Sequence, residues 1–193
     1  MFLRLLLSWQ VLVVLVWTVH PSQASDEPGF LLRGQCPLVQ LGHGFDKHQF
    51  GGIWYRIGGL PNVEEKSVNC TVYDYKATGP GYTVSSTGLD TRGTPVDQSR
   101  ILLQESPDVA RFSTRIRDFD AEMVVLSTDY NSFSCLFTCY NFQGSHKAQF
   151  AWILSRTSGL SKEKIAKCQR ELRDVGVPLE KLRGTFQGAG CRP

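Results

Sequence analysis

The sequence lacks the clustered charge that marks binders of nucleic acid or of membrane surfaces. Its 193 residues carry 21 Lys and Arg against 18 Asp and Glu, so the formal net charge is +3. The basic residues are scattered among carboxylates and form no basic patch along the chain. Because such binding depends on a concentrated positive field, we expect neither a nucleic-acid partner nor a basic membrane-binding surface.

The chain also lacks the patterns on which common catalytic and metal sites depend. It has no Cys-x-x-Cys pair, no glycine-rich phosphate loop, no paired carboxylates and no Ser-His-Asp set. His43, His48 and His146 are unclustered, so a zinc site is not expected. We therefore expect a protein that is not an enzyme and that holds no metal and no cofactor.

Only one long apolar run occurs, and it lies at the N-terminus. Residues 1–17 combine one early positive charge with a near-continuous apolar stretch, and Ser22-Gln23-Ala24 supplies small residues for cleavage. This arrangement is typical of a secretory signal peptide; a membrane anchor is the alternative, but polar residues and a proline interrupt the run. We expect residues 1–24 to be removed, no membrane span, and a secreted protein whose residues 25–193 form a single domain.

Cysteine is the residue type whose number is most informative. The chain has six cysteines, and all of them follow the leader. An even number in a chain bound for an oxidising compartment indicates three disulfides. Cys135 and Cys139 are better explained as strand residues than as metal ligands, and four residues apart on a strand they point to the same face. Spacing alone leaves many pairings open.

Short β-like runs alternate with turn residues over most of the remaining sequence. The expected strands are Ile53–Ile57, Val68–Tyr75, Tyr82–Thr87, Val96–Leu103, Ala110–Ile116, Glu122–Ser127, Ser134–Tyr140 and Gln149–Arg156. Their regular spacing and hairpin-length connections predict an all-β fold, an eight-stranded antiparallel up-and-down β-barrel. Closure of such a barrel removes exposed edges and leaves an interior for one small ligand. A two-sheet sandwich is the alternative.

One amphipathic α-helix is expected after the last strand, at about residues 161–175. Ser161 can serve as its N-cap, and Gly176 can end it. Its apolar stripe consists of Ile165, Cys168 and Leu172. Because an apolar stripe must be buried, we expect the helix to pack on the outside of the barrel, followed by a C-terminal tail at 176–193.

Three short motifs are expected to meet at one end of this barrel. Gly52-Ile53-Trp54 opens the first strand, Thr128-Asp129-Tyr130 follows the sixth, and Arg156 ends the eighth. Arg156 can lie across the Trp54 ring, in a cation–π contact worth about 0.5–2 kcal/mol, and can donate to backbone carbonyls. These residues would then hold the barrel shut without touching a ligand. The expected barrel-closing set is Gly52, Trp54, Thr128, Asp129, Tyr130 and Arg156.

In this order and spacing, the three motifs resemble the structurally conserved regions of the lipocalin family. The segments 130–139, 150–156, 165–168 and 186–191 are similar to the crustacyanin and apolipoprotein D branch, and to crustacyanin subunits in particular. The resemblance covers essentially the whole chain after residue 24. It implies the disulfide pairing Cys36 with Cys139, Cys70 with Cys191 and Cys135 with Cys168.

Side-chain alternation then separates inward from outward positions. Cys135 and Cys139 must face outward if Cys168 on the external helix is to reach one of them, so their neighbours face inward. The cavity candidates are Arg56, Thr71, Tyr73, Tyr75, Leu136, Thr138, Tyr140, Phe150 and Trp152. An aromatic interior with few hydroxyls and one charge suits a mostly apolar ligand with polar ends. Plain core packing is the alternative for the tyrosines and Trp152.

Asn69-Cys70-Thr71 is a sequon for N-glycosylation. If Cys70 faces outward, alternation turns Asn69 inward, which argues against a glycan. Strands splay near the mouth of a barrel, however, and a glycan could still escape there. The sequence therefore leaves the occupancy of Asn69 open.

The resemblance implies a carrier or store for one small hydrophobic ligand, bound without catalysis. Its crustacyanin branch implies a carotenoid of the astaxanthin type. Such a polyene is too long for one barrel, so this version predicts a homo- or heterodimer with another lipocalin subunit. The alternatives are a carrier of a bilin, retinoid, sterol or fatty acid, as in apolipoprotein D-like lipocalins, an isomerase using a cavity cysteine, or an inhibitor that binds through its outer surface.

Overall fold

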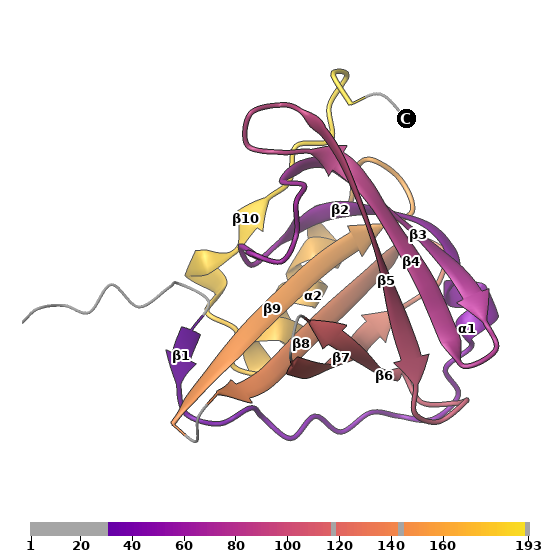
Figure 1. Ribbon diagram of the computed structural model, residues 1–193, viewed down its shortest axis with the longest axis vertical. Coiled ribbons are helices and arrows are strands. Elements are labelled where there is room, and N and C mark those ends of the chain that lie inside the picture. Colours follow the sequence, from indigo (N-terminus) through magenta and orange to yellow (C-terminus); the bar gives the residue numbers. More distant parts are fainter. Residues whose placement is uncertain (1–30, 117–118, 143–144, 192–193) are drawn as a thin grey trace, which may run out of the picture.

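The backbone follows the alternating strand pattern of the sequence and closes into a barrel (Figure 1). The computed structural model describes residues 31–116, 119–142 and 145–191, so the expected signal peptide at 1–24 lies outside the described part. The strands are β1 (Leu31–Arg33), β2 (Gly52–Gly59), β3 (Asn69–Thr78), β4 (Gly81–Leu89), β5 (Pro95–Gln104), β6 (Arg111–Ile116), β7 (Phe119–Thr128), β8 (Phe133–Phe142), β9 (His146–Ser155) and β10 (Arg183–Gly184). The helices are α1 (Lys47–Phe50), α2 (Lys162–Asp174) and a 3-10 turn at Leu179–Lys181.

From β2 to β9, each strand pairs antiparallel with the next in sequence, and β9 returns to pair with β2. This is the predicted eight-stranded up-and-down barrel, and the continuous closure excludes the two-sheet sandwich. The sequence did not predict the two short strands. β1 pairs with β9, and β10 pairs with β2, so the N-terminal arm and the C-terminal tail each extend the sheet.

The predicted external helix is present as α2, which packs against β7, β8 and β9 (Figure 1). The Ser161 side chain caps its N-terminus by accepting the Lys164 N–H. Gly176 adopts a left-handed φ of 79°, and the Val177 N–H donates to the Leu172 carbonyl over 2.9 Å. This is a Schellman arrangement, which satisfies carbonyls that the helix end leaves free. None of the described helices is long and apolar enough to span a membrane.

Two apolar clusters lie on opposite faces of the sheet. The larger one fills the barrel and includes Phe50, Trp54 and Phe112, all fully buried. The other lies between the outer face of the barrel and α2, where Cys168 and Leu172 are fully buried. Burial on both faces of β8 and β9 explains why these strands read as almost continuous apolar runs in the sequence.

Three disulfides fasten peripheral segments to the barrel. They join Cys36 with Cys139, Cys70 with Cys191 and Cys135 with Cys168, the pairing that the family resemblance implies. The bonds attach the N-terminal arm to β8, the C-terminal tail to β3, and α2 to β8. All six cysteines lie in the described part and none is free. Three disulfides fit an oxidising, extracellular compartment.

Candidate functional site

The end of the barrel next to α1 is sealed by Trp54 and Arg156. Trp54 is fully buried, and its indole N–H donates to the Phe50 carbonyl over 2.8 Å. The guanidinium carbon of Arg156 lies 3.7 Å from the centroid of the Trp54 ring. The same guanidinium donates, over 2.8 to 3.2 Å, to the carbonyls of Tyr130, Ile53, Gln49 and Phe50. One side chain thus links α1, β2 and the turn before β8.

The turn between β7 and β8 is organised by the Asp129 carboxylate. It accepts the backbone N–H groups of Ser132 over 2.8 Å and Phe133 over 3.0 Å, and it faces Lys164 of α2 at 3.2 Å. Partial burial opposes ionisation of Asp129, but hydrogen bonds from Ser132, Phe133 and Lys164 outweigh it and hold its pKa well below the usual range. A carboxylate so fixed stabilises the turn and is a poor general base.

The remaining residues of the closing set are neighbours of this turn or of Arg156. Thr128 donates its hydroxyl to the Phe133 carbonyl over 2.8 Å. The Tyr130 hydroxyl accepts the Asp46 N–H over 3.1 Å. Gly52 has a φ of 88°, a left-handed conformation that favours glycine. The structure therefore places the whole set at one end of the barrel, and none of its members lines the cavity described next.

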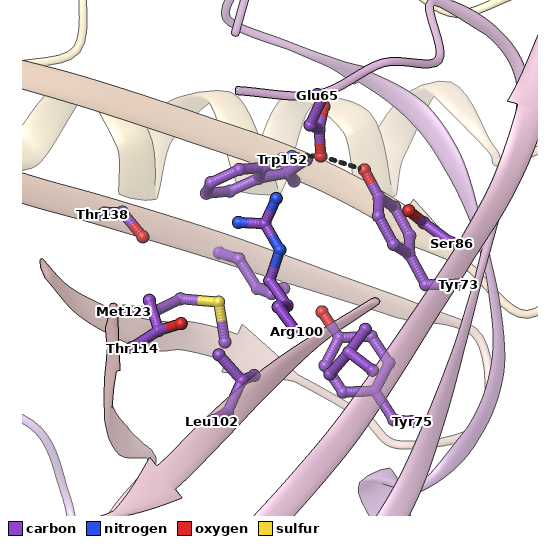
Figure 2. Close-up of a pocket in the computed structure, with 12 residues that line it drawn as sticks. Glu65, Tyr73, Tyr75, Ser86, Arg100, Leu102, Thr114, Met123, Thr138 and Trp152 are labelled. Atoms are coloured by element: carbon purple, nitrogen blue, oxygen red, sulfur yellow. Dashed lines mark hydrogen bonds between the residues drawn. The ribbon is translucent and has the colours of Figure 1, made fainter. Parts of the chain in front are cut away.

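The cavity lies inside the barrel, beyond this closed end (Figure 2). Its volume is about 30 Å³. That is room for only one or two water molecules, whereas ligand pockets span roughly 300–1,000 Å³. A bound organic molecule therefore requires side chains or a loop to move. The lining residues are Glu65, Tyr73, Tyr75, Val84, Ser86, Arg100, Leu102, Thr114, Met123, Leu136, Thr138 and Trp152.

A buried ion pair holds the loop between β2 and β3, residues 60–68, against the cavity. The Oε2 of Glu65, from this loop, accepts from Arg56 Nη1 over 2.7 Å. Its Oε1 accepts from the Tyr73 hydroxyl over 2.5 Å and from the Trp152 indole N–H over 2.8 Å (Figure 2). The side chains of Arg56 and Glu65 are only 8% and 6% exposed. Donors from β2, β3 and β9 thus converge on one loop carboxylate.

Arg100 is the second cation beside the cavity. It shares the inward face of β5 with Leu102, whereas Ile101 and Leu103 are exposed on the outer face. Figure 2 shows its guanidinium pointing into the pocket, toward Trp152 and Glu65. Within the described part of the chain, Arg100 makes no hydrogen bond and no ion pair.

Two tyrosines of the cavity are held in the neutral form. Burial raises the pKa of Tyr73 well above its ordinary value, and the adjacent Glu65 charge raises it further. Burial also raises the pKa of Tyr75, although the positive charge of Arg100 acts in the opposite direction. Tyr75 can therefore donate its hydroxyl to a ligand, whereas the Tyr73 hydroxyl already donates to Glu65 and becomes available only if Glu65 moves. Neither phenol is suited to act as a base near neutral pH.

The structure divides the cavity candidates into two groups. Tyr73, Tyr75, Leu136, Thr138 and Trp152 line the cavity; their contact with a ligand stays a prediction.

Arg56, Thr71, Tyr140 and Phe150 are not among the residues that line this cavity, and their contact with a ligand stays a prediction. Arg56 is turned toward Glu65, and Thr71 is buried where its hydroxyl donates to Ser67 over 3.0 Å. Phe150 is buried between Tyr140 and Trp152, with ring centroids 6.3 and 6.5 Å away. Polar contacts thus hold Arg56 and Thr71 away from this cavity, while Phe150 and Tyr140 pack in the apolar cluster that fills the barrel, on the inward side that alternation assigns to them.

Two charged residues of the cavity, Arg100 and Glu65, were missed by the sequence reasoning. Arg100 had a detectable signal, since it follows the inward alternation of a strand whose next inward residue is Leu102. Glu65 had none, because alternation assigns no direction to a side chain in a loop. The sequence reasoning also assigned no cavity residue to strands β4 to β7. These strands contribute Val84, Ser86, Leu102, Thr114 and Met123 to the cavity wall.

The alternation that turns Asn69 inward does not hold in the structure. The pairing of β3 with β4 shifts between Asn69 and Val72, and Cys70 has a positive φ of 54°. A β-bulge of this kind interrupts alternation. The Asn69 side chain instead accepts the Phe186 N–H of the C-terminal tail over 3.3 Å, and Asn69 does not line the cavity.

Comparison with known proteins agrees with this geometry. The family described as "Lipocalin / cytosolic fatty-acid binding protein family" matches residues 51–189, which include β2 to β10 and α2. The chain belongs to the lipocalin family. The match includes both the sealed end at Trp54 and the cavity of this lipocalin.

Several relatives share most of the length of this lipocalin. Crustacyanin-A1 subunit from Homarus gammarus is 24% identical over 170 residues, which cover 85% of this chain and 94% of that protein. Apolipoprotein D from Mus musculus is 28% identical over 163 residues, which cover 82% and 85%. The structure of lobster apocrustacyanin A1 gives a TM-score of 0.72 at 22% identity, covering 86% of this chain and 96% of that chain. At this identity, structural similarity establishes the barrel but not the ligand.

Proposed function

We propose that this lipocalin is secreted and carries or stores one small hydrophobic molecule in its barrel, without catalysis. The observation that supports the proposal is the cavity wall, which combines aromatic and aliphatic side chains with a few hydroxyls. Burial of apolar ligand surface would supply most of the affinity, at about 25 cal/mol per Å². Thr138 and the phenols of Tyr73 and Tyr75 would orient the polar ends of the ligand.

Uptake of the ligand would require the loop at residues 60–68 to move. The cavity measures about 30 Å³ while Glu65 holds this loop in place. Displacing Glu65 would break the ion pair with Arg56 and the hydrogen bonds from Tyr73 and Trp152 together, because a single carboxylate accepts from all three. Among the described contacts of these three residues with the loop, the bond from Arg56 to the Leu60 carbonyl would remain. We propose that the ligand passes this loop on its way into the barrel.

The finer proposal is a carotenoid of the astaxanthin type. Its support is the similarity to crustacyanin subunits over 85% of the chain. Since the polyene is longer than one barrel, this version includes a homo- or heterodimer with another lipocalin subunit that covers the remainder of the ligand. A bilin, retinoid, sterol or fatty acid is the alternative within the same carrier function.

The test is ligand binding by the full chain, expressed with its own leader in secreting eukaryotic cells. The protein should appear in the medium, begin near residue 25, and bind astaxanthin or retinol to saturation with quenching of tryptophan fluorescence. A carotenoid complex should show a red-shifted visible band that disappears on denaturation. Saturable binding of retinol without binding of astaxanthin would refute the carotenoid and keep the carrier function. Failure to bind any lipophile would refute the carrier function.

The isomerase alternative is tested separately by thiol titration. A cavity-cysteine mechanism needs a free thiolate, and all six cysteines are disulfide-bonded. We expect the native protein to release no reactive thiol, whereas the denatured and reduced protein should release all of them. A reactive thiol in the native protein would instead support catalysis.

A further inference from the structure

Among the described residues that line the cavity, Arg100 is a cation with which no carboxylate of the protein is paired. Two guanidinium groups, those of Arg56 and Arg100, lie beside the cavity, and Glu65 is the only carboxylate that lines it in the described part of the chain. Both oxygens of Glu65 are already occupied, one by Arg56 and the other by Tyr73 and Trp152. Within the described part of the chain, no carboxylate at the cavity accepts a hydrogen bond from Arg100.

We propose that the ligand of this lipocalin is an amphipathic acid, and that Arg100 binds its carboxylate. The proposal rests on the carrier function proposed above. Among the ligands named there it selects those with a carboxyl group, a fatty acid or a bilin, in place of the carotenoid, which has none. A guanidinium is planar and offers a fork of N–H donors that matches the two oxygens of a carboxylate. In a largely apolar cavity such a pair gains more than it would in water, because the surroundings screen it less.

The other arginines held within the fold use their donors on the protein. Arg156 donates to backbone carbonyls at the closed end, and Arg56 binds Glu65 and the Leu60 carbonyl. Arg111 binds Glu122 and the Val39 carbonyl. Arg100 makes no such contact with described residues, although the inward face of β5 directs it into the pocket. Its donors are therefore available to a ligand.

The neighbours of Arg100 suit the rest of such a ligand. The Tyr75 hydroxyl is close enough for the Arg100 charge to affect its pKa, and as a neutral phenol it can donate a second hydrogen bond to a carboxylate. Leu102, Met123 and Leu136 offer apolar surface for a hydrocarbon chain. Met123 is unbranched and flexible, so it can shift to make room when the loop at residues 60–68 moves.

The experiment compares a fatty acid with its uncharged ester. The probes are cis-parinaric acid, a fluorescent polyene acid, and its methyl ester, titrated at pH 7.5 into the wild type, Arg100→Gln and Arg92→Gln. Arg92→Gln removes the same charge from an exposed turn and serves as the matched control. We expect the wild type and Arg92→Gln to bind the acid roughly 10- to 100-fold more tightly than the ester, the range for a charged hydrogen-bonded pair. Arg100→Gln should lose this preference and bind the ester unchanged.

The outcomes separate this proposal from the carrier function. Equal affinity of the wild type for acid and ester would overturn the acid proposal, and this comparison requires no variant to fold. An acid preference that survives in Arg100→Gln would also overturn the role of Arg100. In both cases binding of the ester or of retinol would leave the carrier function intact. Failure of the acid, the ester and retinol to bind would overturn both proposals.

Discussion

The buried pair of Arg56 and Glu65 gives a direct test of how the cavity is closed. Replacing Glu65 by glutamine preserves the shape of the side chain and an oxygen that can accept from Tyr73 and Trp152. It removes the negative charge that faces Arg56, whose side chain is only 8% exposed. Breaking a buried pair from one side costs about 3–5 kcal/mol, because a charge is left buried and uncompensated.

For Glu65→Gln we expect the free energy of unfolding to fall by about 3 kcal/mol, the lower end of that range, because the hydrogen bonds to Glu65 Oε1 are kept. Arg56→Met should cost at least as much, since it leaves a carboxylate that is 6% exposed. In the double variant neither member of the pair is left charged. It should therefore be more stable than the sum of the two losses predicts, with a coupling free energy of about 2 kcal/mol.

The assay is urea unfolding at pH 7 with the disulfides intact, followed by tryptophan fluorescence. Glu180→Gln, on the exposed 3-10 turn, is the matched control and should change stability by less than about 0.5 kcal/mol. Stopped-flow mixing of Glu65→Gln with retinol should also show faster association than the wild type, because the loop at residues 60–68 is held less firmly. The reasoning would be refuted if the free energy of unfolding of both single variants lay within about 0.5 kcal/mol of the wild type and the double variant showed no coupling. The ion pair would then not be what holds this loop in place.

Three further predictions concern the frame around the cavity. Arg156→Met should lower the free energy of unfolding by at least about 3 kcal/mol in urea, because it removes the charged hydrogen bonds to backbone carbonyls and the contact with the Trp54 ring. The pKa of Asp129 is lower in the folded state than its unfolded value near 3.9, so its contribution to stability is present above about pH 4 and is lost as pH falls below that. Asp129→Asn should therefore show a smaller fall in Tm than the wild type on acidification. Replacing Cys135 and Cys168 by alanine should lower stability by about 3–4 kcal/mol, as expected for closing a loop of 33 residues.

Each of these predictions has an outcome that contradicts it. Equal stability of Arg156→Met and an Arg92→Met control would show that the closed end does not depend on this guanidinium. Parallel Tm curves for Asp129→Asn and the wild type between pH 5 and pH 2 would rule out a depressed carboxyl pKa in the turn. Unchanged stability on loss of the disulfide of α2 would show that apolar packing alone holds the helix.

The sequence by itself determined the barrel, its closed end and its external helix. Alternation and turn residues predicted the strands, and the positions of Trp54, Asp129 and Arg156 marked the end at which the barrel closes. The stripe of α2 identified the helix that packs outside. These features depend on short-range periodicity and on motifs whose spacing is fixed along the chain, so they can be read without knowing the register of the sheet.

Only the tertiary structure decided which polar and charged side chains line the cavity. Alternation failed where a bulge at Cys70 interrupts β3, and it could not direct Glu65, which lies in a loop. The partners of Glu65 come from β2, β3 and β9, and Arg100 enters the same cavity from β5. Which side chains meet across a barrel depends on its closure and register, and these join residues far apart in sequence. For that reason the sequence indicates a carrier, while the charge available to its ligand becomes visible only in the folded barrel.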